Sequence, residues 1–216
     1  MSIYNSFKKV IASLEMEELT HPIFYNSPIG IRFNIGDNGN KVYIDRSKEE
    51  LSVNPNYIAA CLERSLKIYH SLKSEPDLLA IEGYLCKNES VDDYISSVVS
   101  ATDLPQPNEI KSELTQNDEE KCIHVFLFWE LNNFKPNKIL EETIKADLGS
   151  GNFFLISSVY FVCTKDNVLF HLYDDRGADL VADKKEKIQH IYHKLNDLIL
   201  DYDRKRIDNI FKTKAE

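Results

Sequence analysis

The chain has 216 residues, of which 43% are hydrophobic and 28% charged, and its 35 acidic side chains outnumber 26 basic ones to give a formal net charge of −9. This length usually corresponds to one domain with a sizeable core, and the 11 Phe and 11 Tyr exclude a disordered composition. The negative charge argues against a nucleic-acid binder, because such proteins carry basic patches.

The N-terminal residues predict neither export nor a membrane anchor. Lys8 and Lys9 precede only a short apolar run before the acidic Glu15, whereas a secretory signal needs a longer one. The longest apolar stretches, around residues 125–128 and 153–162, are too short to span a bilayer.

The cysteines point to a reducing compartment. Cys61, Cys86, Cys122 and Cys163 lie far apart and form no Cys-x-x-Cys pair. Free thiols are therefore favoured over a disulfide framework or a zinc site. We expect a cytoplasmic protein that holds no metal and no cofactor.

The first quarter of the chain predicts two helices with a strand between them. Residues Tyr4 to Leu19 place apolar side chains at helical spacing, and His21-Pro22 ends this pattern because the residue before proline avoids helical geometry. Residues Ile29 to Ile35 alternate apolar and polar side chains, as a half-buried strand does. Asn54-Pro55 opens the second helix, with Asn as its cap and Pro in its first turn, and Glu75-Pro76 closes it.

A strand, a helix and a loop follow. Residues Leu78 to Leu85 form a weaker strand pattern, and Ser90 with Asp93 resembles a capping box at the start of a helix. The segment 103–121 contains prolines and few apolar residues, which predicts a mobile loop or linker.

The second half predicts a strand, a helix and a hairpin. Residues Cys122 to Leu131 are apolar on both faces, as in a central strand. Residues Asn137 to Asp147, followed by Gly149, read as a helix. The strands Phe153 to Thr164 and Val168 to Tyr173 are joined by a short polar turn, which predicts a β-hairpin.

The last predicted element is a long helix. Asp183 with Glu186 resembles a capping box, and apolar residues then recur at helical spacing as far as Ile199. Together the elements predict an α+β fold, with α/β as the alternative, in a single domain over residues 1–216. We expect a mixed sheet of about five strands with flanking helices. Its C-terminal β-hairpin should be followed by the long helix, packed across it.

Two C-terminal motifs carry a family resemblance. The runs Tyr173-Asp174-Asp175-Arg176-Gly177 and Leu200-Asp201-Tyr202-Asp203-Arg204 resemble the signature of an uncharacterised, mainly bacterial family, domain-of-unknown-function family 3885. The specific part of the resemblance covers residues 168–211, and Ile31-Arg32-Phe33 is similar to the family's N-terminal strand motif. Leu198 departs from it, because an aromatic residue is expected there. The resemblance implies one architectural unit around the C-terminal hairpin and helix, and it implies no activity, substrate or cofactor.

The candidate site in these motifs is an Asp/Arg cluster, for which three interpretations remain open. Its members are Asp174, Asp175, Arg176, Gly177, Asp201, Asp203 and Arg204. In the structural interpretation, Arg176 and Arg204 pair with the carboxylates and hold the last helix against the hairpin, and Gly177 allows a positive φ at the turn. The alternatives are a protein-binding surface and a divalent-metal or phosphate site. The spacing of Asp201 and Asp203 argues against a shared metal if that segment is helical.

Other chemistry-bearing residues give weaker signals. His190 and His193 are neighbours on the predicted last helix but lack a third metal ligand. His124 and His171 lie in predicted strands and would approach each other if those strands paired. The chain has no Gly-x-Ser-x-Gly elbow. No catalytic residue and no metal ligand is therefore predicted.

The leading functional hypothesis is a non-enzymatic, cytosolic protein-binding protein, of an immunity or antitoxin type, that masks a basic protein partner. The alternative is an enzyme that acts on a phosphorylated or nucleotide-like small molecule through the Asp/Arg cluster. A third possibility is a subunit whose apolar strands complete an oligomer. Nucleic-acid and membrane partners are not expected.

Overall fold

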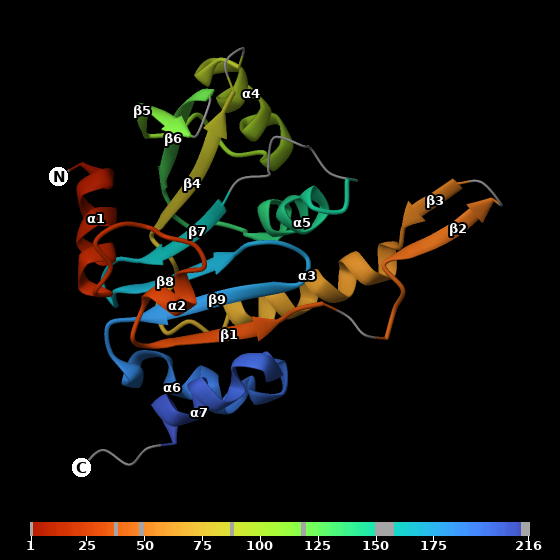
Figure 1. The fold of residues 1–216 in the computed structure, drawn as a ribbon, viewed down its shortest axis with the longest axis vertical. Coiled ribbons are helices and arrows are strands. Elements are labelled where there is room, and N and C mark those ends of the chain that lie inside the picture. The colour runs from red at the N-terminus through yellow and green to blue at the C-terminus, as the bar shows by residue number, and fades with distance from the viewer. Residues whose placement is uncertain are drawn as a thin grey trace.

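A seven-stranded antiparallel sheet organises the chain in the computed structural model, which describes residues 2–36, 39–47, 50–86, 89–117, 120–149 and 158–212 (Figure 1). The strands are β1 (Gly30–Asn34), β2 (Tyr43–Ser47), β3 (Glu50–Val53), β4 (Leu78–Leu85), β5 (Glu109–Asn117), β6 (Glu120–Glu130), β7 (Ser158–Cys163), β8 (Val168–Leu172) and β9 (Gly177–Ala182). The order across the main sheet is β1-β9-β8-β7-β4-β6-β5. The remaining strands, β2 and β3, form a separate hairpin that projects to one side.

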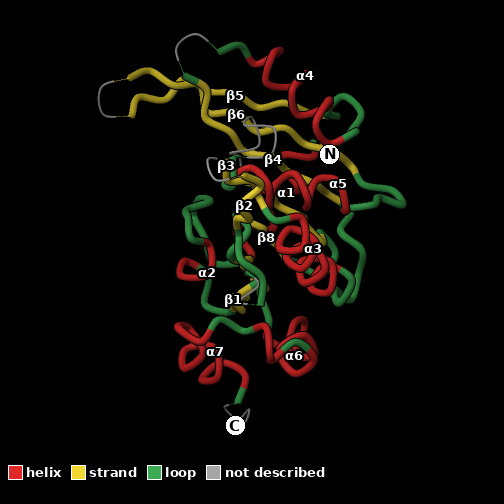
Figure 2. Tube along the Cα trace, turned by 90° about the vertical axis from the view of Figure 1, so that its right-hand side faces the viewer, coloured by secondary structure: helices red, strands yellow, loops and turns green. Residues whose placement is uncertain are grey.

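Helices cover both faces and one end of this sheet. They are α1 (Ile3–Ser13), α2 (Ile23–Asn26), α3 (Pro55–Tyr69), α4 (Val91–Thr102), α5 (Asn137–Ala146), α6 (Lys185–Lys194) and α7 (Arg204–Phe211). Helix α1 packs on β5 and β6, whereas α3, α4 and α5 pack together on the other face. Figure 2 shows α4 at one end of the molecule and the C-terminal helices α6 and α7 at the other. Within the described residues, no helix has both the length and the apolar composition needed to cross a bilayer.

The two faces of the sheet carry separate apolar cores. On the α1 side, Phe7, Val10 and Ile11 project from successive turns of the helix onto Phe128 and Tyr160. The other core is larger and is built from alternate residues of the same strands together with the apolar sides of α3, α4 and α5. Because the central strands are covered on both faces, they are apolar nearly throughout.

Several predicted elements are confirmed where the signal was local. The Asn54 side chain accepts a hydrogen bond from the backbone N–H of Asn56 and caps α3, and the Ser90 hydroxyl does the same for Asp93 at the start of α4. Asn167 takes a left-handed conformation with φ of 48° in the turn between β7 and β8. Residues 153–157, the first part of a predicted strand, lie outside the described residues.

The sheet is larger than predicted, and all its strand pairs are antiparallel rather than mixed. The predicted loop at 103–121 contains β5 and the start of β6. This strand was missed because it lies at the sheet edge, where Ile110 and Leu114 alternate with charged side chains and remain exposed. The other strand of this sheet that was missed, β9, follows directly on the predicted turn and is buried throughout. The hairpin strands β2 and β3 were not predicted either.

Three predicted helix boundaries are wrong. Helix α1 ends at Ser13, where the chain turns through Glu15 with φ of 61°, and α3 ends at Tyr69. The predicted long last helix is two shorter ones. Helix α6 has no side-chain cap, because the Asp183 carboxylate instead accepts a hydrogen bond from the Asn167 side-chain amide and pairs with Lys187.

Between α6 and α7 the chain makes two short 3-10 turns and touches the sheet. The turns are Asn196–Leu198 and Asp201–Asp203. Between them Ile199 forms a β-bridge with Phe33 of β1. This bridge attaches the C-terminal helices to the β1 edge of the sheet. The sequence predicted instead that the last helix packs across the β7–β8 hairpin.

Candidate functional site

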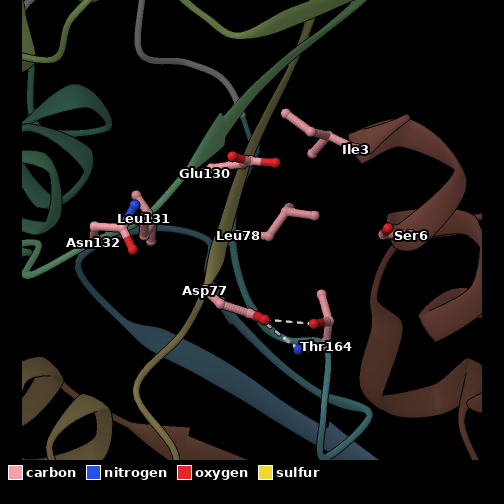
Figure 3. Close-up of a pocket in the computed structure, with 8 residues that line it drawn as sticks. All are labelled: Ile3, Ser6, Asp77, Leu78, Glu130, Leu131, Asn132 and Thr164. Carbon is pink, nitrogen blue, oxygen red and sulfur yellow. Dashed lines mark hydrogen bonds between the residues drawn. The ribbon is translucent and has the colours of Figure 1, made fainter. Parts of the chain in front are cut away.

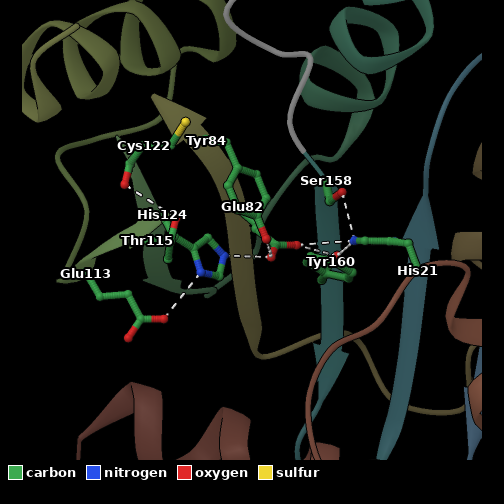
Figure 4. A network of polar contacts seen from close by, with 9 residues as sticks. All are labelled: His21, Glu82, Tyr84, Glu113, Thr115, Cys122, His124, Ser158 and Tyr160. Carbon is green, nitrogen blue, oxygen red and sulfur yellow. Dashed lines mark hydrogen bonds and ion pairs between the residues drawn. The ribbon is translucent and has the colours of Figure 1, made fainter. Parts of the chain in front are cut away.

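A row of polar side chains crosses the face of the sheet that α1 covers. It takes one residue from each of five neighbouring strands, and these are His171, Tyr160, Glu82, His124 and Glu113. The register places His171 opposite Tyr160 and His124 opposite Glu113. We call this set the polar row. The loop before α2 adds His21, and Figure 4 shows Glu82 between His21 and His124.

Glu82 is the centre of the polar row. Its side chain is 4% exposed. One carboxylate oxygen lies 2.8 Å from His124 Nε2, and the other lies 2.8 Å from the Tyr160 hydroxyl and 3.3 Å from His21 Nε2. Burial alone would raise the pKa of Glu82, but these three hydrogen bonds outweigh it and lower the pKa to about 2. The carboxylate is therefore ionised at neutral pH.

His124 lies between two carboxylates. Its Nε2 contacts Glu82, and its Nδ1 lies 3.5 Å from Glu113. The hydrogen bond to Glu82 raises the pKa of His124 although burial opposes this. The ring also stacks on Tyr84, with centroids 4.4 Å apart and planes 2° from parallel. This environment favours the imidazolium form.

His21 uses a single nitrogen for all of its contacts with the row. Its Nε2 lies 2.6 Å from the Tyr160 hydroxyl, 3.2 Å from Ser158 Oγ and 3.3 Å from Glu82. In a Ser-His-acid triad the serine and the acid contact different ring nitrogens. The arrangement of Ser158, His21 and Glu82 therefore does not activate a nucleophile.

Tyr160 and His171 continue the row into the core. Burial raises the pKa of Tyr160 well above its ordinary value, so its hydroxyl remains a hydrogen-bond donor. His171 is fully buried, and neither of its ring nitrogens has a hydrogen-bond partner among the described residues. Burial lowers the pKa of His171 well below its ordinary value and keeps the ring neutral. Its ring centroid lies 4.6 Å from that of Tyr160 and 4.9 Å from that of His21.

A groove of about 480 Å³ opens above the polar end of this row. Its apolar wall consists of Phe7, Ile11 and Phe126, and its rim carries Glu18 and Glu113. Tyr4, Tyr84, His21, His124 and Lys8 complete most of the lining. Cavities of this size with a few convergent polar groups are typical ligand sites. We call it the Glu82 groove.

A second recess, of about 300 Å³, lies at the opposite end of β4 (Figure 3). In this recess the Asp77 carboxylate points toward Thr164. One oxygen accepts from the Thr164 backbone N–H at 2.8 Å and the other from its hydroxyl. This carboxylate stabilises the turn after β7, and the recess offers less chemistry than the Glu82 groove.

The residues of the predicted Asp/Arg cluster do not form one site in the structure; they make separate contacts. Arg176 pairs with Asp174 inside the β8–β9 turn and is 74% exposed, so it does not hold a helix against the hairpin as predicted. Asp175 is buried and accepts a hydrogen bond from the Tyr57 hydroxyl of α3 at 2.5 Å. Arg204 bonds to Asp201 and to backbone carbonyls between α6 and α7.

The buried ion pair of this region is made by Arg32 of β1. Its guanidinium contacts both oxygens of Asp179, at 2.8 and 3.3 Å, and lies 3.8 Å from Asp203. Burial opposes the charge on Arg32, but the bonds with Asp179 outweigh it and raise the pKa of Arg32. Asp203 also accepts a hydrogen bond from the Tyr25 hydroxyl at 2.8 Å. Arg32, which the sequence placed only in a strand motif, thus joins β1, β9 and the C-terminal turns.

Gly177 is required for space rather than for a positive φ. It begins β9, and Gly149 is the glycine with positive φ in the described part of the chain. A Cβ atom at Gly177 would lie 1.8 Å from the Tyr173 hydroxyl and 2.9 Å from the Phe33 carbonyl oxygen. The predicted reason for this glycine is therefore wrong.

The histidine pairs suggested by the sequence do not form. His190 contacts the Ser71 carbonyl at 2.8 Å, whereas His193 is exposed. Strands β4 and β7 separate His124 on β6 from His171 on β8. The described residues contain no group of three or more His, Cys, Asp or Glu side chains placed to hold a metal.

Sequence reasoning missed the polar row, although one signal was present. Glu82 stands within the apolar run of β4, and a carboxylate inside a buried strand needs a partner. Its partners come from β6, β7 and the loop before α2, so their identity depends on strand order. Local pattern cannot give that order.

The comparisons with known proteins yield one family. The family model described as "Domain of unknown function (DUF3885)" matches residues 6–203. No curated protein and no solved structure matches the chain. The matched span contains the polar row, Arg32, Asp179 and the first C-terminal motif, and it ends at Asp203 within the second.

Proposed function

The chain belongs to the DUF3885 family, and we propose that it is a non-enzymatic binding protein whose Glu82 groove receives a basic side chain of a protein partner. The observation that carries this proposal is the charge of the groove lining. Three carboxylates, from Glu18, Glu82 and Glu113, outnumber the two cationic groups, Lys8 and the His124 imidazolium. Since His124 compensates Glu82 and Lys8 can compensate one rim carboxylate, an excess of one carboxylate remains to attract a cation.

Aromatic rings in the same groove suit a guanidinium or ammonium group. Tyr4, Tyr84 and Phe126 line it, and cations bind favourably over such faces. The chain itself contains one such cation–π contact: Lys111 Nζ lies 5.5 Å from the centroid of the Tyr4 ring. A cationic side chain from a partner would find carboxylates and ring faces together.

The polar row supports binding better than catalysis. A carboxylate whose pKa is about 2 is a weak base at neutral pH, and three donors already occupy Glu82. The carboxylates of the Asp/Arg cluster are likewise engaged: Asp175 by Tyr57, Asp203 by Tyr25 and Arg32, Asp174 by Arg176, and Asp201 by Arg204. These contacts argue against the alternative enzyme for phosphorylated or nucleotide-like molecules.

The whole-chain charge supports the same partner. A formal net charge of −9 attracts a basic protein over a distance and accelerates encounter. A protein that masks a basic partner, as immunity and antitoxin proteins do, would use this property. Its association should weaken as ionic strength rises.

The binding test uses small probes, so that the partner need not be known. Acetyl-arginine amide is titrated into isotopically labelled protein, with acetyl-citrulline amide as a neutral probe of nearly the same shape. We expect arginine to shift the amide signals of Tyr84, Glu113 and His124, and citrulline to leave them in place. Equal shifts with both probes, or shifts confined to the β2–β3 hairpin, would contradict the proposal.

Variants then connect the probe to the groove. Glu18→Gln should weaken arginine binding about two- to fivefold, and Tyr84→Leu should weaken it further by removing a ring face. Glu63→Gln is the matched control, because Glu63 is an exposed carboxylate on α3 that pairs with Lys67. A native partner isolated by affinity capture should be lost with Glu18→Gln/Tyr84→Leu and retained with Glu63→Gln.

A further inference from the structure

The two edges of the main sheet end differently. At β1 the C-terminal segment covers the outer edge, because the Leu200 N–H donates to the Arg32 carbonyl at 2.9 Å and Ile199 bridges Phe33. At the other end, β5 pairs with β6 and with no other strand that the structure describes. Its outer N–H and C=O groups are available to a further strand.

Strand β5 lacks most of the features that normally protect an edge. It is nine residues long, and its register with β6 is continuous from Glu109 to Asn117. Two of its apolar side chains are exposed, Ile110 by 43% and Leu114 by 68%. Protected edges are usually short, bulged, covered or charged. Of these features β5 shows charged side chains, but they are of both signs and can pair with a second strand.

We propose that β5 pairs antiparallel with β5 of a second copy of this chain, about a two-fold axis at Ser112. In this register Ser112 faces its own counterpart, Lys111 faces Glu113, and Ile110 faces Leu114. A two-fold axis normal to the sheet keeps each side chain on its own face, so the opposed residues meet side by side. The result is one continuous sheet through both copies.

Charge selects this register over its neighbours. With the axis at Ser112, both Lys111–Glu113 pairs unite opposite charges, which stabilises a strand pair, and the Ile110–Leu114 pairs are apolar. An axis at Lys111 would oppose Lys111 to itself and Glu109 to Glu113. An axis at Glu113 would oppose that carboxylate to itself. Like charges directly opposite destabilise a sheet.

The charged side chains are accessible for this contact. Lys111 is 47% exposed and lies 3.1 Å from Glu109 in its own strand. Glu113 is 74% exposed and lies 3.5 Å from His124 Nδ1. Both also line a recess of about 150 Å³ beside the Glu82 groove, with Tyr4, Ser112, His124 and Phe126. Lys111 of the second copy would therefore stand at the open side of the groove.

The first experiment is a charge exchange followed by sedimentation velocity over a range of protein concentrations. The wild type should form a concentration-dependent dimer. Lys111→Glu alone and Glu113→Lys alone should each raise its dissociation constant about tenfold or more, because both pairs become like-charged. Mixing the two variants should restore association as a heterodimer, since their charges are then complementary.

Each outcome decides the proposal. A wild-type protein that stays monomeric, a dimer indifferent to both substitutions, or a mixture that fails to associate would overturn it. Circular dichroism and thermal unfolding of each variant show whether the fold is intact, and recovery in the mixture itself excludes misfolding. No ligand is needed, so the result is independent of the proposed groove function.

The second experiment tests the register. Ser112→Cys, in a Cys86→Ser background that removes the exposed thiol, should form an intermolecular disulfide on mild oxidation, because directly opposed residues lie close enough. Thr115→Cys in the same background is the control and also carries Cys122→Ser, because Cys122 lies opposite position 115 in β6; the Thr115 counterpart in the second copy would lie several residues away. Equal cross-linking of both variants would contradict an axis at Ser112.

Discussion

His124 Nε2 lies 2.8 Å from Glu82 Oε1 and gives the buried carboxylate its principal cationic partner. Neither side chain would be stable in this position alone, because an unpaired charge in the core is costly. The contact joins β4 to β6 at the point where the Glu82 groove opens. It therefore contributes both to the sheet and to the site.

Glu82→Ala is expected to lower the free energy of unfolding by about 3–5 kcal/mol, because it leaves the partly buried His124 and the buried Tyr160 without their acceptor. Urea denaturation measures the loss. Glu113→Gln is the matched control at the same histidine, and because that carboxylate is largely exposed its removal should cost less than about 1 kcal/mol. Similar small losses in both variants would contradict the central role of Glu82.

The polar row predicts a stability maximum at mildly acidic pH. The pKa of His124 is raised from 6.5, so its contribution is complete below that value and is lost as pH rises through the folded pKa. The pKa of Glu82 is lowered to about 2, so its contribution is present above its ordinary pKa of 4.5 and is lost as pH falls toward 2.

Urea denaturation at a series of pH values checks this profile. In the wild type, stability should decline as pH rises from 6.5 through the folded pKa of His124, and this decline should be much smaller in His124→Asn. The acid-side decline should persist in that variant, since Tyr160 and His21 still contact Glu82. An unchanged alkaline decline in His124→Asn would assign it to another group.

Arg32→Met is expected to cost about 3–5 kcal/mol, because Asp179 is 0% exposed and would lose its counter-ion. Arg176→Ala should cost less than about 1 kcal/mol, because Arg176 is 74% exposed and contacts its own turn. The structural interpretation of the sequence assigned this stabilising ion pair to Arg176 instead of Arg32. Denaturant unfolding of the two variants side by side decides between these arginines.

Gly177→Ala is expected to destabilise by about 1–3 kcal/mol through overpacking. Adding Tyr173→Phe should recover only part of the loss, because the Phe33 carbonyl oxygen still lies 2.9 Å from the new Cβ position. Gly149→Asn is the control, since no atom lies within 4 Å of a Cβ there and Asn tolerates its φ of +65°. Thermal unfolding of the three variants measures these effects.

The sequence predicted elements whose causes are local and missed those whose causes are distant. Asn54 and Ser90 cap their helices through bonds to residues two and three positions on, so their signals stand in the sequence itself. Strand β5 was taken for a loop because an edge strand needs only one neighbour, and its exposed side chains therefore resemble those of a loop.

The residues of the candidate site were also predicted only where their contacts are local in sequence. The acidic and arginine residues of the C-terminal motifs are close in sequence, which made a shared cluster plausible, yet most of them bond within their own turn. Glu82 and His124 are 42 positions apart and meet only because β4 and β6 are neighbours. Arg32 fits the polar side of an alternating strand, and its burial could be known only once Asp179 was placed opposite it.

The pairing of β1 with β9 also has a consequence for synthesis. Arg32 precedes Asp179 by 147 positions, and at translation rates of about 5–20 residues per second the ribosome needs roughly 7–30 s to cover that interval. Until then β1 has no neighbouring strand, and Ile31 and Phe33 are without the core that buries them. This edge of the sheet is therefore completed late in synthesis, and until then β1 is an unpaired strand.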